Sequence, residues 1–227
     1  MKFSLRIEQS LPSTQTVAVA EARAGAPEGT AILARQQTAG RGRGERAWSS
    51  PMGNLSLSLV LRPQAPMRDS PQWALRAAVA LAETLLPYAP ELRLKWPNDV
   101  MLGNAKLAGI LAEAEADAEG GIAHLVLGIG ANLAHAPELP GRATACLPPP
   151  HPAPEDVAEA LLGAIAMWHA APFAAVREAW LARGPSLGAP LTLRDGRKGL
   201  FAGMAENGNL LLDVAGRTQA IFAGELD

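Results

Sequence analysis

The sequence has few of the residues that build disulfides, metal clusters or membrane spans. Cys146 is its only cysteine, so the chain can form no internal disulfide and no zinc site built on several cysteines. Its four histidines are scattered, which argues against a histidine-rich metal site. No apolar run approaches the roughly 18 residues of a membrane span, and the N-terminus lacks the hydrophobic core of a signal peptide. We therefore expect a globular, cytoplasmic protein without a membrane partner.

An excess of positive charge is also missing. The 20 basic residues are balanced by 22 acidic ones, giving a net charge of −2, so no general positive field would attract nucleic acid. Only four of the basic residues are lysines, and two of them, Lys95 and Lys106, fall in one distinctive stretch. Hydrophobic residues make up 48 % of the 227 positions, which is enough for a substantial core and excludes wholesale disorder.

Strand and helix patterns alternate along the first 184 residues. Residues 54–61 alternate leucine with serine, which predicts a strand with one buried face. The other expected strands are 3–7, 30–36, 92–96, 100–102, 106–113 and 122–129, and the expected helices are 14–23, 70–86, 156–168 and 172–183. This order predicts a domain of helices and strands over residues 1–184.

The pattern changes after Gly184-Pro185. Four short strands are expected at 191–193, 199–204, 210–214 and 219–222, separated by the turn signals Asp195-Gly196, Asn207-Gly208 and Ala215-Gly216. Hairpins at this spacing predict a small all-β barrel. We place it at residues 185–227, as a second domain.

A glycine–arginine loop, Gln37 to Trp48, reads QTAGRGRGERAW. Glycines let backbone N–H groups approach an anion, and guanidinium groups bind phosphate or carboxylate with two parallel hydrogen bonds. The alternative is a flexible basic loop or an RNA tether. The position of the loop between two strands, rather than in a low-complexity tail, favours an anion-binding role.

A second candidate is the stretch Lys95-Trp-Pro-Asn-Asp99, followed by Lys106 and then Leu-Ala-Gly-Ile-Leu. If Gly103-Asn104 closes a hairpin, Asp99 and Lys106 face each other near its open end. The alternative is an ordinary surface ion pair. Further along, Gly128-Ile-Gly-Ala-Asn132 is a strand end at which missing side chains leave room for a ligand.

Together these segments resemble the biotin protein ligases. Ser13-Thr14, QTAGRGRGERAW, KWPNDVMLGNAKLAGIL (95–111) and GIGANL (128–133) occur in the order and spacing of that family. The resemblance implies an α+β fold, a mixed β-sheet backed by helices as in class II synthetases, with a C-terminal SH3-like β-barrel. It also implies that the enzyme activates biotin with ATP to biotinyl-5′-AMP, releasing pyrophosphate, and transfers biotin to one lysine of a biotin carboxyl carrier domain.

The resemblance assigns a role to individual residues. Ser13, Thr14, Gln37, Arg41, Gly109, Gly128 and Gly130 would bind biotin; Arg43, Arg46, Trp48, Asn98, Lys106 and Asn132 would bind ATP; and Lys106, Asp99, Arg41 and Arg43 would act in catalysis. No metal ligand is identified directly, but Mg²⁺ would enter with ATP, and Asp99 is available to contact it. Gly44-Glu45 departs from the family loop, which has glycine at the second of these positions. Two outcomes are open: the glutamate alters the closed loop, or Gly44 takes over the flexible role.

Two alternatives remain at this stage. A lipoate- or octanoate-protein ligase would share the fold and the acyl-transfer chemistry, and a catalytically inactive ligand-binding relative would share the fold alone. The first expected strand begins at residue 3, so we expect the monofunctional type, without the DNA-binding domain of some members and without a DNA partner. The acceptor is expected to be the carrier domain of acetyl-CoA carboxylase or a related carboxylase, and the ligase a monomer or homodimer.

Overall fold

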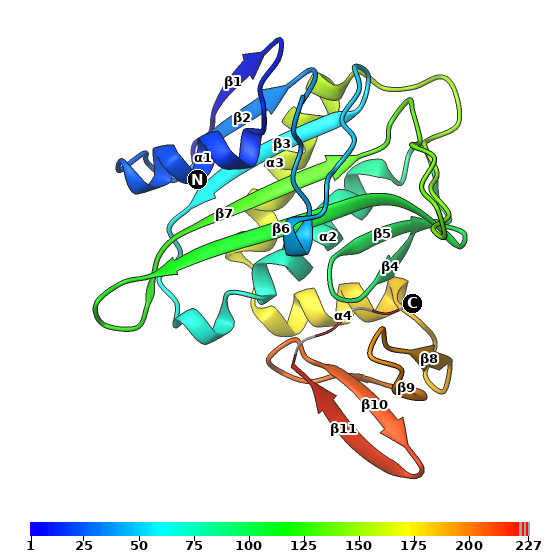
Figure 1. The fold of residues 1–227 in the computed structure, drawn as a ribbon. Helices are drawn as coiled ribbons and strands as arrows, with labels where there is room; N and C mark the ends of the chain where they lie inside the picture. Colours follow the sequence, from blue (N-terminus) through cyan, green and yellow to red (C-terminus); the bar gives the residue numbers. More distant parts are fainter. Residues whose placement is uncertain (223, 225, 227) are drawn as a thin grey trace.

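A seven-stranded mixed sheet forms the centre of the molecule, which is a computed structural model that describes residues 1–222, 224 and 226 (Figure 1). The strand order is β1-β2-β3-β7-β6-β5-β4. The strands are β1 (Ser4–Glu8), β2 (Thr30–Ala34), β3 (Leu55–Leu61), β4 (Arg93–Lys95), β5 (Asp99–Leu102), β6 (Ala105–Ala116) and β7 (Ile122–Ala131). β1 runs parallel to β2, whereas the other pairs are antiparallel. The expected mixed sheet is confirmed.

Helices cover both faces of this sheet. α1 (Thr14–Arg23) packs on one face, where Ala18 and Ala22 meet Ile32 and Val126. The other face carries the main core and the helices α2 (Gln72–Leu85), α3 (Pro154–Ala170) and α4 (Phe173–Arg183) (Figure 1). Two short 3-10 helices, η1 (Arg43–Glu45) and η2 (Met67–Asp69), lie in loops. None of the helices in the described part of the chain has the length and apolar character needed to cross a membrane.

The α1 helix begins where the sequence predicts. Ser13 has an extended backbone, and its side chain accepts a hydrogen bond from the backbone N–H of Thr16 at 3.4 Å, as an N-cap does. This cap places Ser13, Thr14 and Gln15 at the start of the helix, where Thr14 and Gln15 contact Ser58 at the middle of β3. All three are buried.

The expectation of one buried face for the leucine–serine strand is wrong. Every residue of β3 is buried, including Ser56 and Ser58. The leucines enter the main core, and the serine face lies on the side of the sheet that α1 covers. A buried row of hydroxyls costs free energy unless its members have hydrogen-bond partners. These serines therefore mark a site rather than a solvent-facing surface.

A second sheet of four antiparallel strands follows, in the order β11-β10-β9-β8 (Figure 1). Its strands are β8 (Pro190–Thr192), β9 (Lys198–Met204), β10 (Leu210–Val214) and β11 (Arg217–Ile221), consistent with an SH3-like domain. Of the expected 185–227 unit, positions 223, 225 and 227 lie outside the described residues. Trp96 Nε1 donates to the Gly208 carbonyl at 3.2 Å, and Arg177 Nε donates to the Met204 carbonyl at 2.6 Å. These bonds hold the small sheet against α4 and against Trp96, the residue that follows β4.

Candidate functional site

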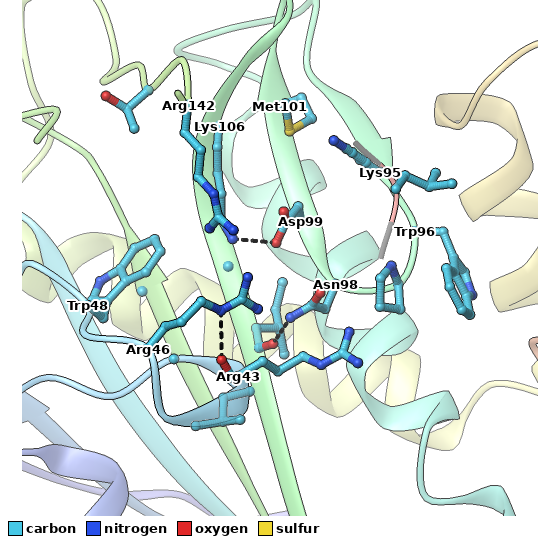
Figure 2. Close-up of a pocket in the computed structure, with 18 of the residues that line it drawn as sticks. Arg43, Arg46, Trp48, Lys95, Trp96, Asn98, Asp99, Met101, Lys106 and Arg142 are labelled. Carbon is cyan, nitrogen blue, oxygen red and sulfur yellow. Dashed lines mark hydrogen bonds and ion pairs between the residues drawn. The ribbon is translucent and has the colours of Figure 1, made fainter. Parts of the chain in front are cut away.

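A cavity of about 1070 Å³ opens over the strands β6 and β7. Its walls come from the start of α1, the glycine–arginine loop, the β4–β5 hairpin, residues 139–144 and the C-terminal sheet. Figure 2 shows side chains from several of these segments pointing into the same space. All of the expected site residues except Asn132 line this cavity.

The cavity concentrates positive charge in a chain that is slightly acidic overall. Among the described residues that line it, eight are basic and Asp99 alone is acidic. The basic residues are Arg41, Arg43, Arg46, Arg93, Lys95, Lys106, Arg142 and Arg194. A concave site lined by one sign of charge raises the local concentration of ligands of the opposite sign. The cavity is therefore suited to a polyanion.

Lys106 and Asp99 lie where several of these charged side chains meet, and they form an ion pair there, with Lys106 Nζ 2.6 Å from Asp99 Oδ1 (Figure 2). We call this part of the cavity its charged end. The expected meeting of the two side chains is confirmed, but the expected register is wrong. Lys106 pairs with Met101 and Asp99 with Gly109, and the register shifts between Val100 and Met101. The turn does close the hairpin, and Gly103 adopts φ +57° there.

Glycines on β6 and β7 make room for large side chains above the sheet. A Cβ on Gly130 would lie 2.4 Å from Trp48 Nε1, and a Cβ on Gly109 would lie 3.1 Å from Lys106 Nζ. Trp48 and Lys106 therefore pack directly over bare backbone, with the ammonium 5.5 Å from the centre of the indole ring. Asn98 stabilises the same part of β6, because its amide donates to the Ile110 carbonyl at 2.5 Å.

The opposite end of the cavity is uncharged, polar and buried. Thr14 Oγ1 lies 2.9 Å from Ser58 Oγ and 3.1 Å from Gln37 Oε1, and Gln37 also accepts from the backbone N–H of Thr14 at 2.7 Å. Ser13, Thr14 and Ser58 are each at most 3 % exposed. Short donors and acceptors packed this tightly suit a compact ligand that both donates and accepts hydrogen bonds.

Gln15, Ser56 and Ser58 also line this end, although the sequence analysis did not identify them. The sequence could have indicated the two serines, because hydroxyl side chains at every second position of a strand give it an unusual polar face. Gln15 directly follows Ser13-Thr14 in the helix cap. A Cβ on Gly128 would lie 2.5 Å from Gln15 Oε1, so the amide lies against backbone of β7.

The glycine–arginine loop supplies three guanidinium groups with different partners. Arg41 pairs with Glu113 on β6 at 2.9 Å. Arg43 NH1 reaches the Gly224 carbonyl at 3.5 Å, and Arg46 Nε donates to the Arg43 carbonyl at 2.8 Å (Figure 2). Gly44 adopts φ +60°, ψ +43°, the left-handed conformation that favours glycine. The left-handed turn therefore lies at Gly44, one residue before the position at which the family loop has glycine.

Asn132 is not among the residues that line the cavity. Its amide donates to the Ala145 carbonyl at 3.1 Å, and its backbone carbonyl accepts from Leu147 at 3.3 Å. Asn132 is 2 % exposed, and its Oδ1 atom has no hydrogen-bond partner among the described residues. Such a buried acceptor costs free energy until a donor reaches it.

Residues 139–144 form another wall of the cavity, which the sequence analysis did not identify. Lys106 N donates to the Ala143 carbonyl at 2.9 Å, and Ala145 N donates to the Lys106 carbonyl at 3.0 Å. This pairing continues the sheet beyond the end of β7. It brings Arg142 beside Lys106, and Figure 2 shows their charged ends pointing to the same place.

The comparisons with known proteins agree with this geometry. The model of the biotin/lipoate A/B protein ligase family matches residues 7–132, more than half of the chain. The chain belongs to this family. A biotin–[acetyl-CoA-carboxylase] ligase of Paracoccus denitrificans is 40 % identical over 213 residues, covering 86 % of this chain and 88 % of the relative. A ligase of the same description from Mycobacterium tuberculosis is 33 % identical over 232 residues, covering 94 % and 85 %.

Among solved structures, the fold matches a biotin protein ligase from Aquifex aeolicus in complex with biotin and ATP. The TM-score is 0.83 at 26 % identity, covering 99 % of this chain and 97 % of that one. The family match ends at residue 132, whereas the structural match includes the C-terminal sheet. In this member of the family, Pro190, Thr192, Arg194 and Leu226 from that C-terminal region line the cavity.

The cavity of this family member offers little to a resident metal ion. No group of three or more histidine, cysteine, aspartate or glutamate side chains that could hold a metal occurs among the described residues. Mg²⁺ bound with a nucleotide needs few protein ligands, because phosphate oxygens and water supply the remainder. Asp99, the acidic side chain in the wall, fits that limited requirement.

Proposed function

We propose that this protein is a biotin–[carboxyl-carrier protein] ligase. It joins biotin and ATP to form biotinyl-5′-AMP and pyrophosphate, and then transfers the biotinyl group to a lysine of a carrier domain. The observation that carries the proposal is a single cavity with a buried, uncharged polar end and a strongly cationic end. Biotin has a ureido ring that donates and accepts hydrogen bonds, which suits the polar end of the cavity. It also has a carboxylate at the end of its side chain, which suits the cationic end.

The polar end would hold the ureido ring. Ser13, Thr14 and Gln37 present hydroxyl and amide groups there, and Gln15 and Ser58 complete the same cluster. Gly128 lets the Gln15 amide lie directly against β7, beside the place proposed for the ring. Buried groups of this kind favour a ligand that satisfies them and reject one that leaves them unpaired.

The cationic end would bring the carboxylate to the α-phosphate of ATP. A carboxylate oxygen attacks the α-phosphorus, a new oxygen–phosphorus bond forms, and the bond to the leaving pyrophosphate breaks. Negative charge then accumulates on the phosphate oxygens. Lys106, with Arg43 and Arg46 from the loop, places positive charge there before the reaction begins. Such fixed charge is usually a large part of catalysis.

Transfer breaks the bond on the other side of the same oxygen. The neutral amine of the carrier lysine attacks the biotinyl carbonyl carbon, an amide bond forms, the carbon–oxygen bond to the phosphate breaks, and AMP departs with its electron pair. The proton released by the amine passes to the AMP phosphate or to water. Asp99 and Lys106 remain beside the departing phosphate. Asp99 is also the residue that would contact Mg²⁺, which shields phosphate charge when bound with ATP.

The nucleotide base would lie near Trp48, whose ring packs over Gly130. Asn132 does not line the cavity, so its expected part in ATP binding would be indirect, through its hydrogen bond to the Ala145 carbonyl. Gly109 and Gly130 let Lys106 and Trp48 lie close against β6 and β7 at the side of the ligand. These assignments place the expected site residues, apart from Arg41, Asn98 and Asn132, along one ligand path.

A lipoate ligase is the second candidate, because the family description includes lipoate. The dithiolane ring of lipoate has no hydrogen-bond donors, so it would leave the buried hydroxyl and amide cluster unsatisfied. The relatives from Paracoccus and Mycobacterium are both named as biotin–[acetyl-CoA-carboxylase] ligases. Both observations favour biotin.

The decisive experiment measures exchange of labelled pyrophosphate into ATP with biotin or lipoate as the acid. Biotin should support exchange and lipoate should not, and mass spectrometry should detect biotinyl-5′-AMP in the biotin reaction. Exchange with lipoate at equal or higher efficiency would overturn the assignment. Absence of exchange with either acid would overturn adenylation altogether.

The remaining assignments extend this proposal. The acceptor is the carrier domain of acetyl-CoA carboxylase or a related carboxylase, and the reaction belongs in the cytoplasm because ATP and that acceptor are found there. We propose domains at residues 1–184 and 185–227, a monomer or homodimer, and no DNA partner. A gel-shift assay at low salt should then show only weak retention that does not depend on sequence.

A further inference from the structure

Glu113 lies just outside the cavity and contacts two of its walls. It follows Gly109 and Leu111 on β6 at two-residue spacing, which places it on the cavity side of the sheet. Its Oε1 accepts from Arg41 NH2 at 2.9 Å, and its Oε2 accepts from Gln15 Nε2 at 2.8 Å. One carboxylate therefore joins β6, the glycine–arginine loop and the start of α1.

These contacts fix the amide of Gln15 in one orientation. Both of its N–H bonds are used, one by Glu113 and the other by the Val126 carbonyl at 3.3 Å. Its oxygen accepts from Ser58 Oγ at 3.1 Å and lies against Gly128. An ionised carboxylate can only accept hydrogen bonds, so Glu113 keeps the amide nitrogen toward itself. The amide oxygen is thereby presented to the cavity.

The Glu113 carboxylate also holds the glycine–arginine loop at Arg41. The side chains of Arg41 and Glu113 are 42 % and 33 % exposed, and an ion pair with this much solvent contact contributes little to folding stability. Its effect is on position: it places Arg41 beside the uncharged end of the cavity rather than with Lys106. Glu113 therefore links the loop at Arg41 to the floor of the ureido site at Gln15, in addition to the hydrogen bonds of Gln37 to Thr14.

We propose that Glu113 is a positioning residue for biotin. It orients the Gln15 oxygen as an acceptor for a ureido N–H and holds the loop at Arg41 over the same end of the ligand. The inference rests on the proposed function and adds to it a residue that touches neither substrate. It predicts that Glu113 affects biotin recognition while leaving ATP recognition unchanged.

The variant Glu113→Gln tests this, because glutamine has the same shape but carries no charge and presents an N–H₂ group in place of one acceptor. Glu115→Gln is the matched control: Glu115 lies on the same strand and accepts from Arg23 Nε of α1 at 2.6 Å, outside the cavity. Pyrophosphate exchange measured against each substrate should show the KM for biotin rising about ten-fold in Glu113→Gln. The KM for ATP should change less than about two-fold, and Glu115→Gln should resemble the wild type.

A third variant shows whether Glu113 acts through Gln15. Gln15→Ala should also raise the KM for biotin. In the double variant with Glu113→Gln, the fold-increase in the KM for biotin should be smaller than the product of the two single increases, because both substitutions remove the same contact. An unchanged KM for biotin in Glu113→Gln, or an equal rise for ATP, would overturn the inference while leaving the proposed function intact. A wild-type protein without biotin-dependent exchange would overturn both.

Discussion

Lys106 and Asp99 form an ion pair at 2.6 Å although the ladder between their strands does not pair them. Between the pairs Val100–Ala108 and Met101–Lys106, β6 has one extra residue, Leu107. This irregularity sends Leu107 into the core and leaves Lys106 on the same side as Gly109. Strict alternation would have put residues three apart on opposite faces of the sheet. A single extra residue thus delivers the ammonium to the cavity.

Replacing Lys106 with alanine should abolish adenylate formation while preserving the fold. The change removes the ammonium between Asp99 and the reacting phosphate, and losing one preorganised group of this kind costs about 10² to 10³ in rate. Pyrophosphate exchange measures the loss, and thermal unfolding measures the fold. Lys198→Ala, at an exposed position on β9, is the control and should keep wild-type rates. A Lys106→Ala enzyme of normal activity would show that the reacting centre has been misassigned.

The sequence predicts the elements better than it predicts their contacts. The helix cap at Ser13, the hairpin at Gly103-Asn104 and the four C-terminal strands follow from local rules, because each depends on a few neighbouring residues. The extra residue at Leu107 and the burial of Ser56 and Ser58 depend on what packs against the strand, which no local pattern records. The contribution of the C-terminal sheet to the cavity is likewise a tertiary property.

Arg142 was not identified as a site residue from the sequence, yet it lies beside Lys106 in the cavity wall (Figure 2). Two cations at one place favour a ligand with several negative charges, such as the polyphosphate of ATP. Arg142→Ala should therefore raise the KM for ATP about ten-fold, within the usual loss for a charge-assisted hydrogen bond, and leave the KM for biotin unchanged.

Steady-state exchange kinetics with each substrate varied in turn would measure this. Arg217→Ala, at an exposed position on β11, removes the same charge away from the cavity and should have no effect. An Arg142→Ala enzyme whose KM for ATP matches that of Arg217→Ala would remove Arg142 from the nucleotide site.

Gly130→Ala should displace Trp48 from the sheet. The new Cβ would lie 2.4 Å from Trp48 Nε1, closer than any non-bonded contact allows, so the indole and the adjoining loop must move. Trypsin should then cleave faster after the loop arginines, and adenylate formation should fall. Gly163→Ala is the control, because a Cβ at that position in α3 meets open space. Equal cleavage rates for both variants would mean that Trp48 does not depend on the bare backbone of β7.

His169 should make the protein less stable as the pH falls. Burial lowers its pKa from 6.5, and Arg76 lowers it further, whereas Glu28 opposes the shift. Trp73 Nε1 donates to His169 Nδ1 at 3.5 Å, a contact that requires this nitrogen to be unprotonated. Because the unfolded chain binds the proton more readily than the folded one, stability present above about pH 6.5 is lost as the pH falls below it.

Replacing His169 with glutamine isolates this contribution. The glutamine oxygen can accept from Trp73 without titrating, so the unfolding midpoint in urea should fall less between pH 7 and pH 5.5 than it does in the wild type. His124, whose pKa burial also lowers, remains in both proteins and contributes equally. Above pH 7, both histidines are neutral in the folded and unfolded chains. The unfolding midpoint should therefore change with pH in nearly the same way in the two proteins there. Parallel curves over the acidic range would show that His169 does not couple folding to protonation.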